Sequence, residues 1–129
     1  MVGREQFHFE LEHIKALIIE LAERAETQLR RSVDALYMAD VTLAEQVIEA
    51  DSELDKKELE INEATIVLIA REQPVASDLR RLIIALKISS DLERMADHAK
   101  NIAKSTLHLG AENGINIHQK IGDMAEMGL

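Results

Sequence analysis

Apolar residues recur every three or four positions along three long stretches of this sequence, and only two short segments interrupt them. This spacing places the apolar side chains along one side of an α-helix. The first helix should cover residues 4–38, which corresponds to roughly 50 Å at about 1.5 Å per residue. A helix of this length needs neighbours of similar length, and short connections make consecutive helices antiparallel. The sequence therefore predicts an all-α fold, an antiparallel up-down-up three-helix bundle of the spectrin-like kind.

Helix-capping residues mark the two interruptions. In the segment MADVTLAE, Asp40 can cap the second helix, and Thr42 with Glu45 forms an alternative capping box. In the segment REQPVAS, Pro74 lacks an amide hydrogen and suits a first helical turn, while Ser77 is a second possible cap. We therefore expect the second helix to end near residue 71 and the third to reach about residue 107.

Each predicted helix has a candidate core side. That of the first helix comprises Phe7, Leu11, Ile14, Ile18, Leu21, Ala25, Leu29, Ser32 and Leu36. That of the second helix keeps heptad spacing, which is typical of shallow left-handed packing, and comprises Leu43, Val47, Ala50, Leu54, Ile61, Ala64 and Leu68. In the third helix the buried side should change along the chain, from Leu79, Leu82, Ile83 and Leu86 to Ile88, Leu92, Met95, Ala99, Ile102 and Thr106.

The C-terminal part of the chain departs from the three-helix pattern. We expect the bundle to cover residues 4–108, a linker loop to cover residues 109–116, where LGAENGIN carries two glycines, and the beginning of a fourth helix to cover residues 117–129. Three apolar residues of the last segment share one side of such a helix: Ile117, Ile121 and Met124. An exposed apolar side favours association, so we expect a homo-oligomer, with a homodimer as the simplest form.

The amino-acid composition disfavours several classes of binding partner. The chain carries a net charge of −9 and 2% aromatic residues, so it lacks the basic surface and the stacking platforms that nucleic-acid binding uses. Cysteine is absent, which excludes disulfides and thiolate metal sites. The first residues lack a secretory hydrophobic region, and the apolar runs ATIVLIA and LIIAL are too short to cross a bilayer. We expect a cytoplasmic protein without direct membrane insertion.

Two stripes of oxygen-bearing side chains accompany the predicted core. One contains Asp51, Asp55, Glu58 and Asn62, and the other contains Ser90, Glu93, Asp97 and Asn101. Acids four residues apart repel each other on a helix, whereas a hard cation prefers several oxygen ligands in a small volume. Carboxylates that point outward from two helices of a bundle could therefore bind a metal ion together. A solvated face is the more usual role of such a carboxylate row, because 24 of the 129 residues are acidic and such pairs also arise by chance.

The sequence contains no pattern that demands catalysis. No nucleophile is paired with a base, and no glycine-rich phosphate-binding loop occurs. A di-metal carboxylate enzyme would need Glu-x-x-His pairs on inward faces, and Glu5 to His8, like Glu10 to His13, places this spacing near the N-terminus. We therefore expect no enzymatic activity.

Two segments carry a family resemblance: QPVASDLRRLIIALKISSDLERMADHAKNIAK and ALYMADVTLAEQVIEADSELDKKELEI. In these segments the sequence resembles the PhoU family of phosphate-uptake regulators. The resemblance spans Phe7 to about Lys104 and departs at Ala96, where the family often has glycine. It implies three-helix bundles, normally two in tandem, and metal clusters bound through Glu/Asp-x-x-x-Asp motifs. Those motifs match Asp51 with Asp55 and Glu93 with Asp97, and further candidate ligands are Asp78 and Asn101.

The resemblance also implies a function. Such a protein would repress phosphate-starvation signalling, and so act indirectly on transcription, by linking a phosphate ABC transporter to a sensor histidine kinase. The bound metal would be iron, zinc, manganese or magnesium. The spacing in INIHQKIGDMAEMGL resembles the opening helix of a second repeat. The alternative is a metal-independent adaptor or oligomerisation module that binds partner helices.

Overall fold

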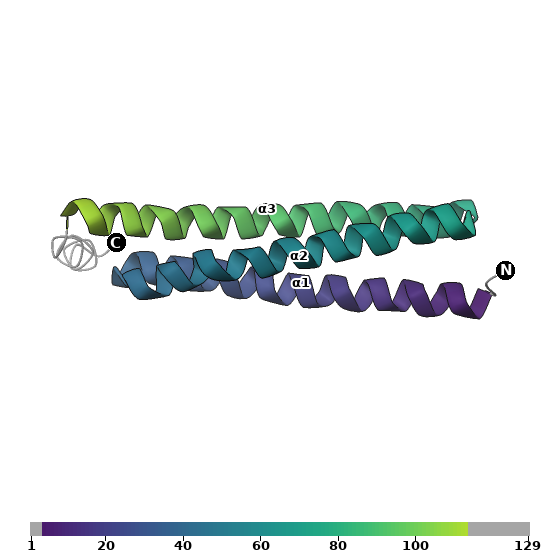
Figure 1. The fold of residues 1–129 in the computed structure, drawn as a ribbon, viewed down its shortest axis with the longest axis horizontal. Helices are drawn as coiled ribbons and strands as arrows, with labels where there is room; N and C mark the ends of the chain where they lie inside the picture. The colour runs from purple at the N-terminus through teal and green to yellow at the C-terminus, as the bar shows by residue number, and fades with distance from the viewer. Residues whose placement is uncertain (1–3, 114–129) are drawn as a thin grey trace, which may run out of the picture. The chain divides into compact units, whose positions relative to one another are not determined.

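The computed structural model describes residues 4–113, which form three helices (Figure 1). Helix α1 covers Arg4–Met38, α2 covers Val41–Glu72 and α3 covers Ala76–Asn113, and residues 4–113 contain no strand. The all-α fold and its three long helices confirm the prediction. The predicted fourth helix, residues 117–129, lies outside the described residues.

The predicted linker begins too early. Residues 109–113 belong to α3, although the two glycines in this region favoured a loop. At Gly110, an added Cβ would lie 3.0 Å from Cγ2 of Val41, the first residue of α2. Glycine therefore allows the end of α3 to approach the start of α2 closely, and this contact offsets the low helix propensity of glycine.

The helix ends follow from local chemistry. Asp40 Oδ1 accepts a hydrogen bond of 3.0 Å from the Leu43 amide, which confirms the predicted cap of α2. The Leu79 amide donates to the carbonyl of Val75, so α3 starts directly after Val75 and Pro74 precedes the first turn. Helices α1 and α2 are each followed by a non-glycine residue in the left-handed region, Ala39 with φ 51° and Gln73 with φ 43°.

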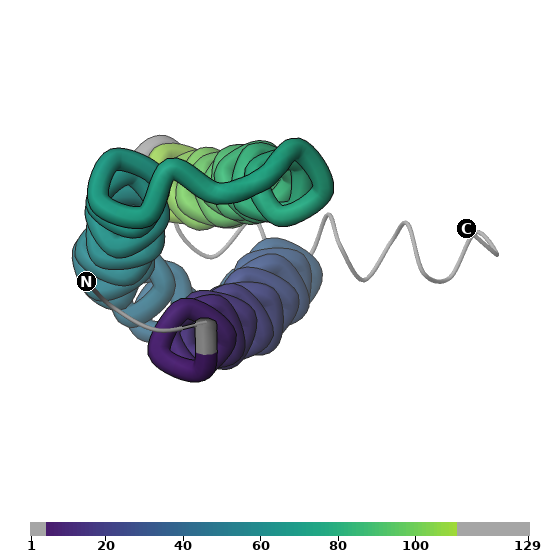
Figure 2. The backbone as a smooth tube through the Cα atoms, turned by 90° about the vertical axis from the view of Figure 1, so that its right-hand side faces the viewer, coloured from purple at the N-terminus to yellow at the C-terminus, as the bar shows by residue number. Residues whose placement is uncertain are grey.

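The described residues group into two compact units, each containing one segment of every helix. Unit 1 takes residues 4–25 and 53–94, and unit 2 takes residues 26–52 and 95–113. Within each unit α2 runs antiparallel to α1 and α3, and the view along the helices shows the three segments of unit 1 around a common centre (Figure 2). Each unit is therefore an up-down-up three-helix arrangement with its own core.

The two cores differ in composition. Unit 1 buries mainly large apolar side chains, with four smaller ones (Ala25, Thr65, Ala85 and Ser89); the large ones are Phe7, Ile14, Leu17, Leu21, Leu54, Ile61, Leu68 and Leu82. Unit 2 buries small or polar side chains: Gln28, Ser32, Ala35, Ala44, Val47, Asp51, Ala96, Ala99, Ala103 and Thr106. Small side chains remove less apolar area from water. The stability of unit 2 therefore depends more on close helix contact and on internal polar contacts.

Every second core position predicted for α2 is wrong by one residue. Positions seven residues apart on the buried side are called a layer. Val47, Leu54, Ile61 and Leu68 are buried as predicted, but the alternate layer consists of Ala44, Asp51 and Thr65, in place of Leu43, Ala50 and Ala64. Leu43 packs instead at the edge of a cluster formed by Ala35, Ala44, Val47 and Ala103. The buried side chains in this layer of α2 are thus small or polar.

The predicted change of side in α3 is wrong. One stripe is buried along the whole helix: Leu82, Ala85, Ser89, Ala96, Ala99, Ala103 and Thr106. Ile83 and Ile88, both predicted in the core, are 53% and 42% exposed. Close packing through alanine and serine leaves the isoleucines outside the bundle.

Candidate functional site

Asp51 is the buried residue among the four predicted metal ligands. Its side chain lies on α2 of unit 2 and is 3% exposed. One carboxylate oxygen, Oδ2, lies 3.3 Å from Nζ of Lys100 on α3. The other, Oδ1, is buried and has no hydrogen-bond partner in the structure. Because a buried carboxylate normally satisfies both oxygens, Oδ1 is an acceptor with unused capacity.

The prediction that all of these acids point outward is wrong for Asp51. The side chain occupies the same layer of α2 as Ala44, seven residues earlier, and Thr65, fourteen residues later, so Asp51 lies on the buried side. The Lys100 side chain is 33% exposed, so the partner of this carboxylate remains in contact with water. The spacing of residues within α2 gave no indication of Lys100, which lies on α3.

The other candidates in unit 2 are on the surface. Asp97 and Asn101 lie on successive turns of α3 and are exposed. The backbone carbonyl of Asn101 accepts a hydrogen bond of 3.0 Å from Ser105 Oγ, and this contact leaves its side-chain amide out of the interaction. The exposure of Asp97 and Asn101 agrees with the predicted outward stripe of α3.

The remaining candidates belong to unit 1. Asp55 on α2 is exposed, and Glu93 on α3 is half-buried. Asp78 is half-buried in the first turn of α3, where a negative charge also interacts favourably with the helix dipole. The interaction with the helix dipole accounts for an acid at this position without a metal.

The donor chemistry fits a hard cation, since every candidate offers carboxylate or amide oxygen. The unsatisfied Oδ1 of Asp51 supports such a ligand in particular. Within residues 4–113, however, no three or more acidic or histidine side chains form a group that could hold a metal ion. The set Asp51, Asp55, Glu93 and Asp97 stays a prediction.

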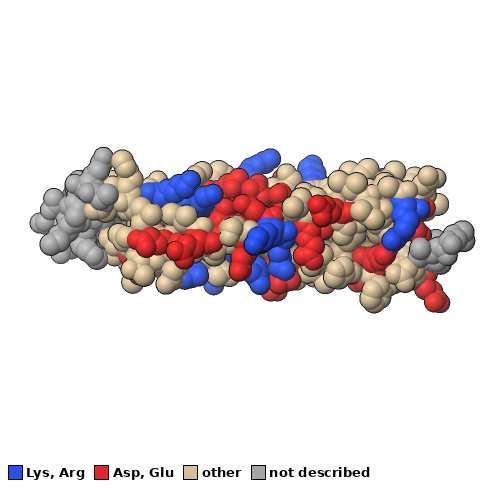
Figure 3. Space-filling view, viewed as in Figure 1, with Lys and Arg blue, Asp and Glu red and all other residues tan. Residues whose placement is uncertain are grey.

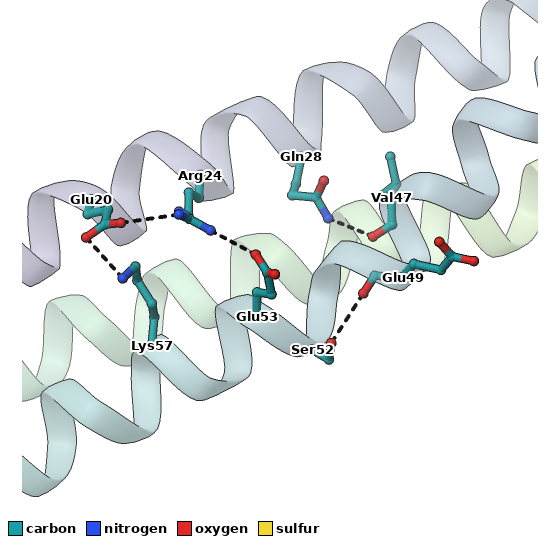
Figure 4. Close-up of polar contacts among 8 residues, drawn as sticks. All are labelled: Glu20, Arg24, Gln28, Val47, Glu49, Ser52, Glu53 and Lys57. Atoms are coloured by element: carbon teal, nitrogen blue, oxygen red, sulfur yellow. Dashed lines mark hydrogen bonds and ion pairs between the residues drawn. The ribbon is translucent and has the colours of Figure 1, made fainter.

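A second buried polar contact lies in unit 2. Gln28 on α1 is 4% exposed, and its Nε2 donates a hydrogen bond of 2.7 Å to the backbone carbonyl of Val47 on α2 (Figure 4). Arg31 reinforces the same pair of helices with a contact of 2.6 Å to Gln46. The apolar spacing of α1 predicted Leu29 in the core, whereas the adjacent Gln28 is the buried residue.

An ion-pair chain joins α1 to α2 in unit 1. Glu20 accepts from Lys57 at 3.0 Å and from Arg24 at 3.3 Å, and Arg24 also reaches Glu53 at 3.1 Å (Figure 4). The hydrogen bond from Lys57, followed by the charges of Lys57 and Arg24, lowers the pKa of Glu20 below its ordinary value of 4.5, although desolvation opposes the shift. Acidic side chains gather in patches with basic ones between them on the face shown in Figure 3. The described surface is thus acidic but locally paired.

The fold and these contacts define a class of protein: an all-α, three-helix bundle with carboxylates in i, i+4 pairs and a buried carboxylate in its small-residue core. None of the three described helices is long and apolar enough to span a membrane. Residues 18–106 match the family model of the PhoU domain, and the chain belongs to the PhoU family.

Curated relatives agree with the family match. The chain is 41% identical over 112 residues to the phosphate-specific transport system accessory protein PhoU homolog of Zymomonas mobilis, covering 87% of this chain and 46% of that protein. It is 38% identical over 118 residues to the homolog of Aquifex aeolicus, covering 92% of this chain and 53% of that protein. For the homolog of Clostridium acetobutylicum the identity is 37% over 122 residues, with 94% and 56% covered. The chain therefore spans about half the length of these relatives.

Proposed function

We propose that the chain acts in the control of phosphate uptake, together with a phosphate-specific transport system. The observation that carries this proposal is the match to relatives named as accessory proteins of that system, at 38–41% identity over most of this chain. By family resemblance, the role is negative regulation of phosphate-starvation signalling in the cytoplasm, through a transporter and a sensor histidine kinase. A bundle of three rigid helices suits such a role, because it presents long surfaces to partner proteins without chemistry of its own.

Complementation tests this role. The chain is expressed in a bacterium that lacks its own PhoU protein, and a phosphate-starvation promoter drives a reporter. We expect reporter expression to fall in high phosphate when the chain is present. The core variant Ile61→Asp, which places a charge at a fully buried position, should leave the reporter active. If the reporter stays active although the wild-type chain is soluble and helical in these cells, the result contradicts the proposed role.

We further propose that Asp51, Asp55, Glu93 and Asp97 bind a divalent or trivalent cation. The support comes from the family motif, from the oxygen donor set and from the unsatisfied Oδ1 of Asp51. A bound cation would neutralise the negative charges of the carboxylates that hold it. Its effect would be structural, on the surface presented to partners.

Metal content is measured by elemental analysis after gentle purification. We expect Glu93→Ala combined with Asp97→Ala to lower the metal content per chain. The matched control is Glu45→Ala with Glu49→Ala, because these two residues form an exposed acidic i, i+4 pair on α2 outside the motifs. Equal metal content in wild type and in the Glu93/Asp97 variant contradicts the assignment.

The second candidate function is a metal-independent adaptor that binds partner helices. The large apolar side chains left on the surface favour it, among them Ile19, Ile66, Val67, Ile83 and Ile84. Treatment with a chelator distinguishes the metal-dependent regulator from the metal-independent adaptor. Partner binding that survives chelator treatment supports the adaptor, and partner binding that depends on added metal supports the metal-dependent regulator.

A further inference from the structure

Helices α1 and α3 of unit 1 enclose an apolar groove that none of the described residues fills. Its volume is about 380 Å³. The apolar lining residues with the largest side chains are Leu11, Ile14, Ile18, Ile19, Ile84 and Ile88. The lining covers residues 11–19 of α1 and 81–88 of α3, which is about two helical turns of each. The groove is therefore long enough to receive a short stretch of another helix.

Three of the isoleucines that line this groove are in contact with solvent. Ile19 is 51% exposed, Ile84 is 48% exposed and Ile88 is 42% exposed. Burial of apolar area is favourable, so covering these three side chains stabilises a complex. Clusters of large apolar side chains on a surface are typical of interaction sites.

Basic residues surround the same groove. Lys15 and Arg81 line it beside one acid, Glu12, and Arg80 and Lys87 are exposed on the same segment of α3. Among the ion pairs of the described residues, none involves Lys15, Arg80, Arg81 or Lys87. The charged residues that line the groove thus carry a net positive charge, because they comprise two bases and one acid, in a chain whose net charge is −9.

This charge selects among possible occupants. A second copy docked groove to groove across a two-fold axis would bring the positively charged borders of the two grooves together, and like charges in proximity are unfavourable. A concave groove between two helices also matches the ridge of a helix better than the flat surface of a bilayer. An amphipathic helix with acidic residues beside its apolar side satisfies both the shape and the charge.

We propose that this groove binds an amphipathic helix of a partner protein, with apolar residues at positions i, i+4 and i+7 and acidic residues flanking them. The apolar residues would insert between Ile19, Ile84 and Ile88, and the acids would pair with Lys15 and Arg81. The inference rests on the proposed function, because it assigns a partner surface to the regulator, and it requires no metal.

The test uses two synthetic peptides of roughly 18 residues, long enough to form about five helical turns. The first carries leucines at the stated spacing with glutamates beside them, and the second has lysines in place of the glutamates. Binding of each labelled peptide to the purified chain is measured by fluorescence anisotropy. We expect the acidic peptide to bind at least tenfold more tightly than the basic one.

Matched substitutions then locate the site. Ile84→Asp should weaken binding of the acidic peptide at least tenfold. Ile66→Asp, at an exposed isoleucine of α2 outside the groove lining, should leave this binding unchanged. Arg81→Glu should reverse the preference between the two peptides, and Lys104→Glu, an exposed base of unit 2, should not. Circular dichroism confirms that each variant remains helical.

Several results overturn the proposal: no binding of the acidic peptide, equal binding of both peptides, or equal effects of Ile84→Asp and Ile66→Asp. Two more do so: a dimer in sedimentation that Ile84→Asp dissociates, and binding to anionic phosphatidylglycerol vesicles that Ile84→Asp abolishes. Peptide binding is measured on the purified chain, so its failure leaves the reporter assay of phosphate regulation intact. Conversely, a reporter that the chain cannot repress overturns the phosphate role while peptide binding still stands.

Discussion

Lys100 Nζ lies 3.3 Å from Oδ2 of Asp51, while Oδ1 of the same buried carboxylate has no hydrogen-bond partner. The pair crosses from α2 to α3 in the unit whose core consists mainly of alanine and polar side chains. The ammonium group thus partly neutralises a carboxylate that we propose as a metal ligand. The Lys100 ammonium group is therefore the positive charge that pairs with Asp51 in this structure.

Removing this cation should destabilise the chain. In Lys100→Met the side-chain volume is largely kept but the Asp51 charge is left buried without its partner, which should cost about 1–3 kcal/mol of unfolding free energy, since Lys100 itself is partly exposed. Urea unfolding measures the change. Asp51→Leu combined with Lys100→Met should regain much of the loss, because it removes both charges. Lys104→Met, at an exposed position of the same helix, should change the stability by less than about 0.5 kcal/mol. Equal stability of Lys100→Met and wild type would contradict a structural role for the pair.

Helix positions were predictable because they depend on local chemistry. Asp40 caps α2 as its side chain and position suggest, and α1 ends at Met38, as the apolar pattern indicates. The exact core register was not predictable. Leu43 and Ala44 both fit a three–four spacing, and the rotation of α2 about its axis decides that Ala44 is the buried one.

The candidate site shows the same limit. The i, i+4 spacing correctly placed Asp97 and Asn101 on an exposed side of α3. It could not reveal that Asp51 is buried or that Lys100, 49 residues further along the sequence, is its partner. Contacts between helices depend on how the helices rotate about their axes, and a pattern within one helix does not specify that rotation. The exposure of Ile83 and Ile88 was missed for the same reason.

Gln28 should contribute to the stability of unit 2 through its hydrogen bond to the Val47 carbonyl. Gln28→Leu keeps a similar volume and loses the hydrogen bond, which should lower the unfolding free energy by about 1 kcal/mol. Gln28→Ala also leaves a cavity and should cost about 2 kcal/mol or more. Gln6→Leu, at an exposed position of α1, serves as the control for urea unfolding. A gain in stability in Gln28→Leu would show that the buried amide is a net cost to the fold.

The ion pairs of Glu20 predict a pH dependence. Since Lys57 lowers the pKa of Glu20 in the folded chain, the folded state binds fewer protons than the unfolded state near that pKa. The stabilisation is therefore present above about pH 4.5, the ordinary value, and is lost as the pH falls through the lower folded pKa. Glu20→Gln should reduce stability near neutral pH and make little difference in acid, as measured by urea unfolding between roughly pH 3 and pH 7. Glu63→Gln, an exposed acid of α2, should show no such pH-dependent difference from wild type.

Ala39 holds a left-handed conformation between α1 and α2, with φ 51°. The Asp40 amide donates to the Ala35 carbonyl at 2.9 Å, which is the hydrogen bond that closes a helix at such a residue. Ala39→Gly should relieve the steric cost of the alanine Cβ, and we expect a net gain of about 0.5–1 kcal/mol in unfolding free energy after the larger entropy of the unfolded glycine chain is included. Ala16→Gly, at an exposed position inside α1, should instead lose about 1 kcal/mol. If both substitutions destabilise the chain equally in thermal and urea unfolding, the left-handed conformation at Ala39 carries no strain, and the sharp turn into α2 is maintained by the Asp40 cap alone.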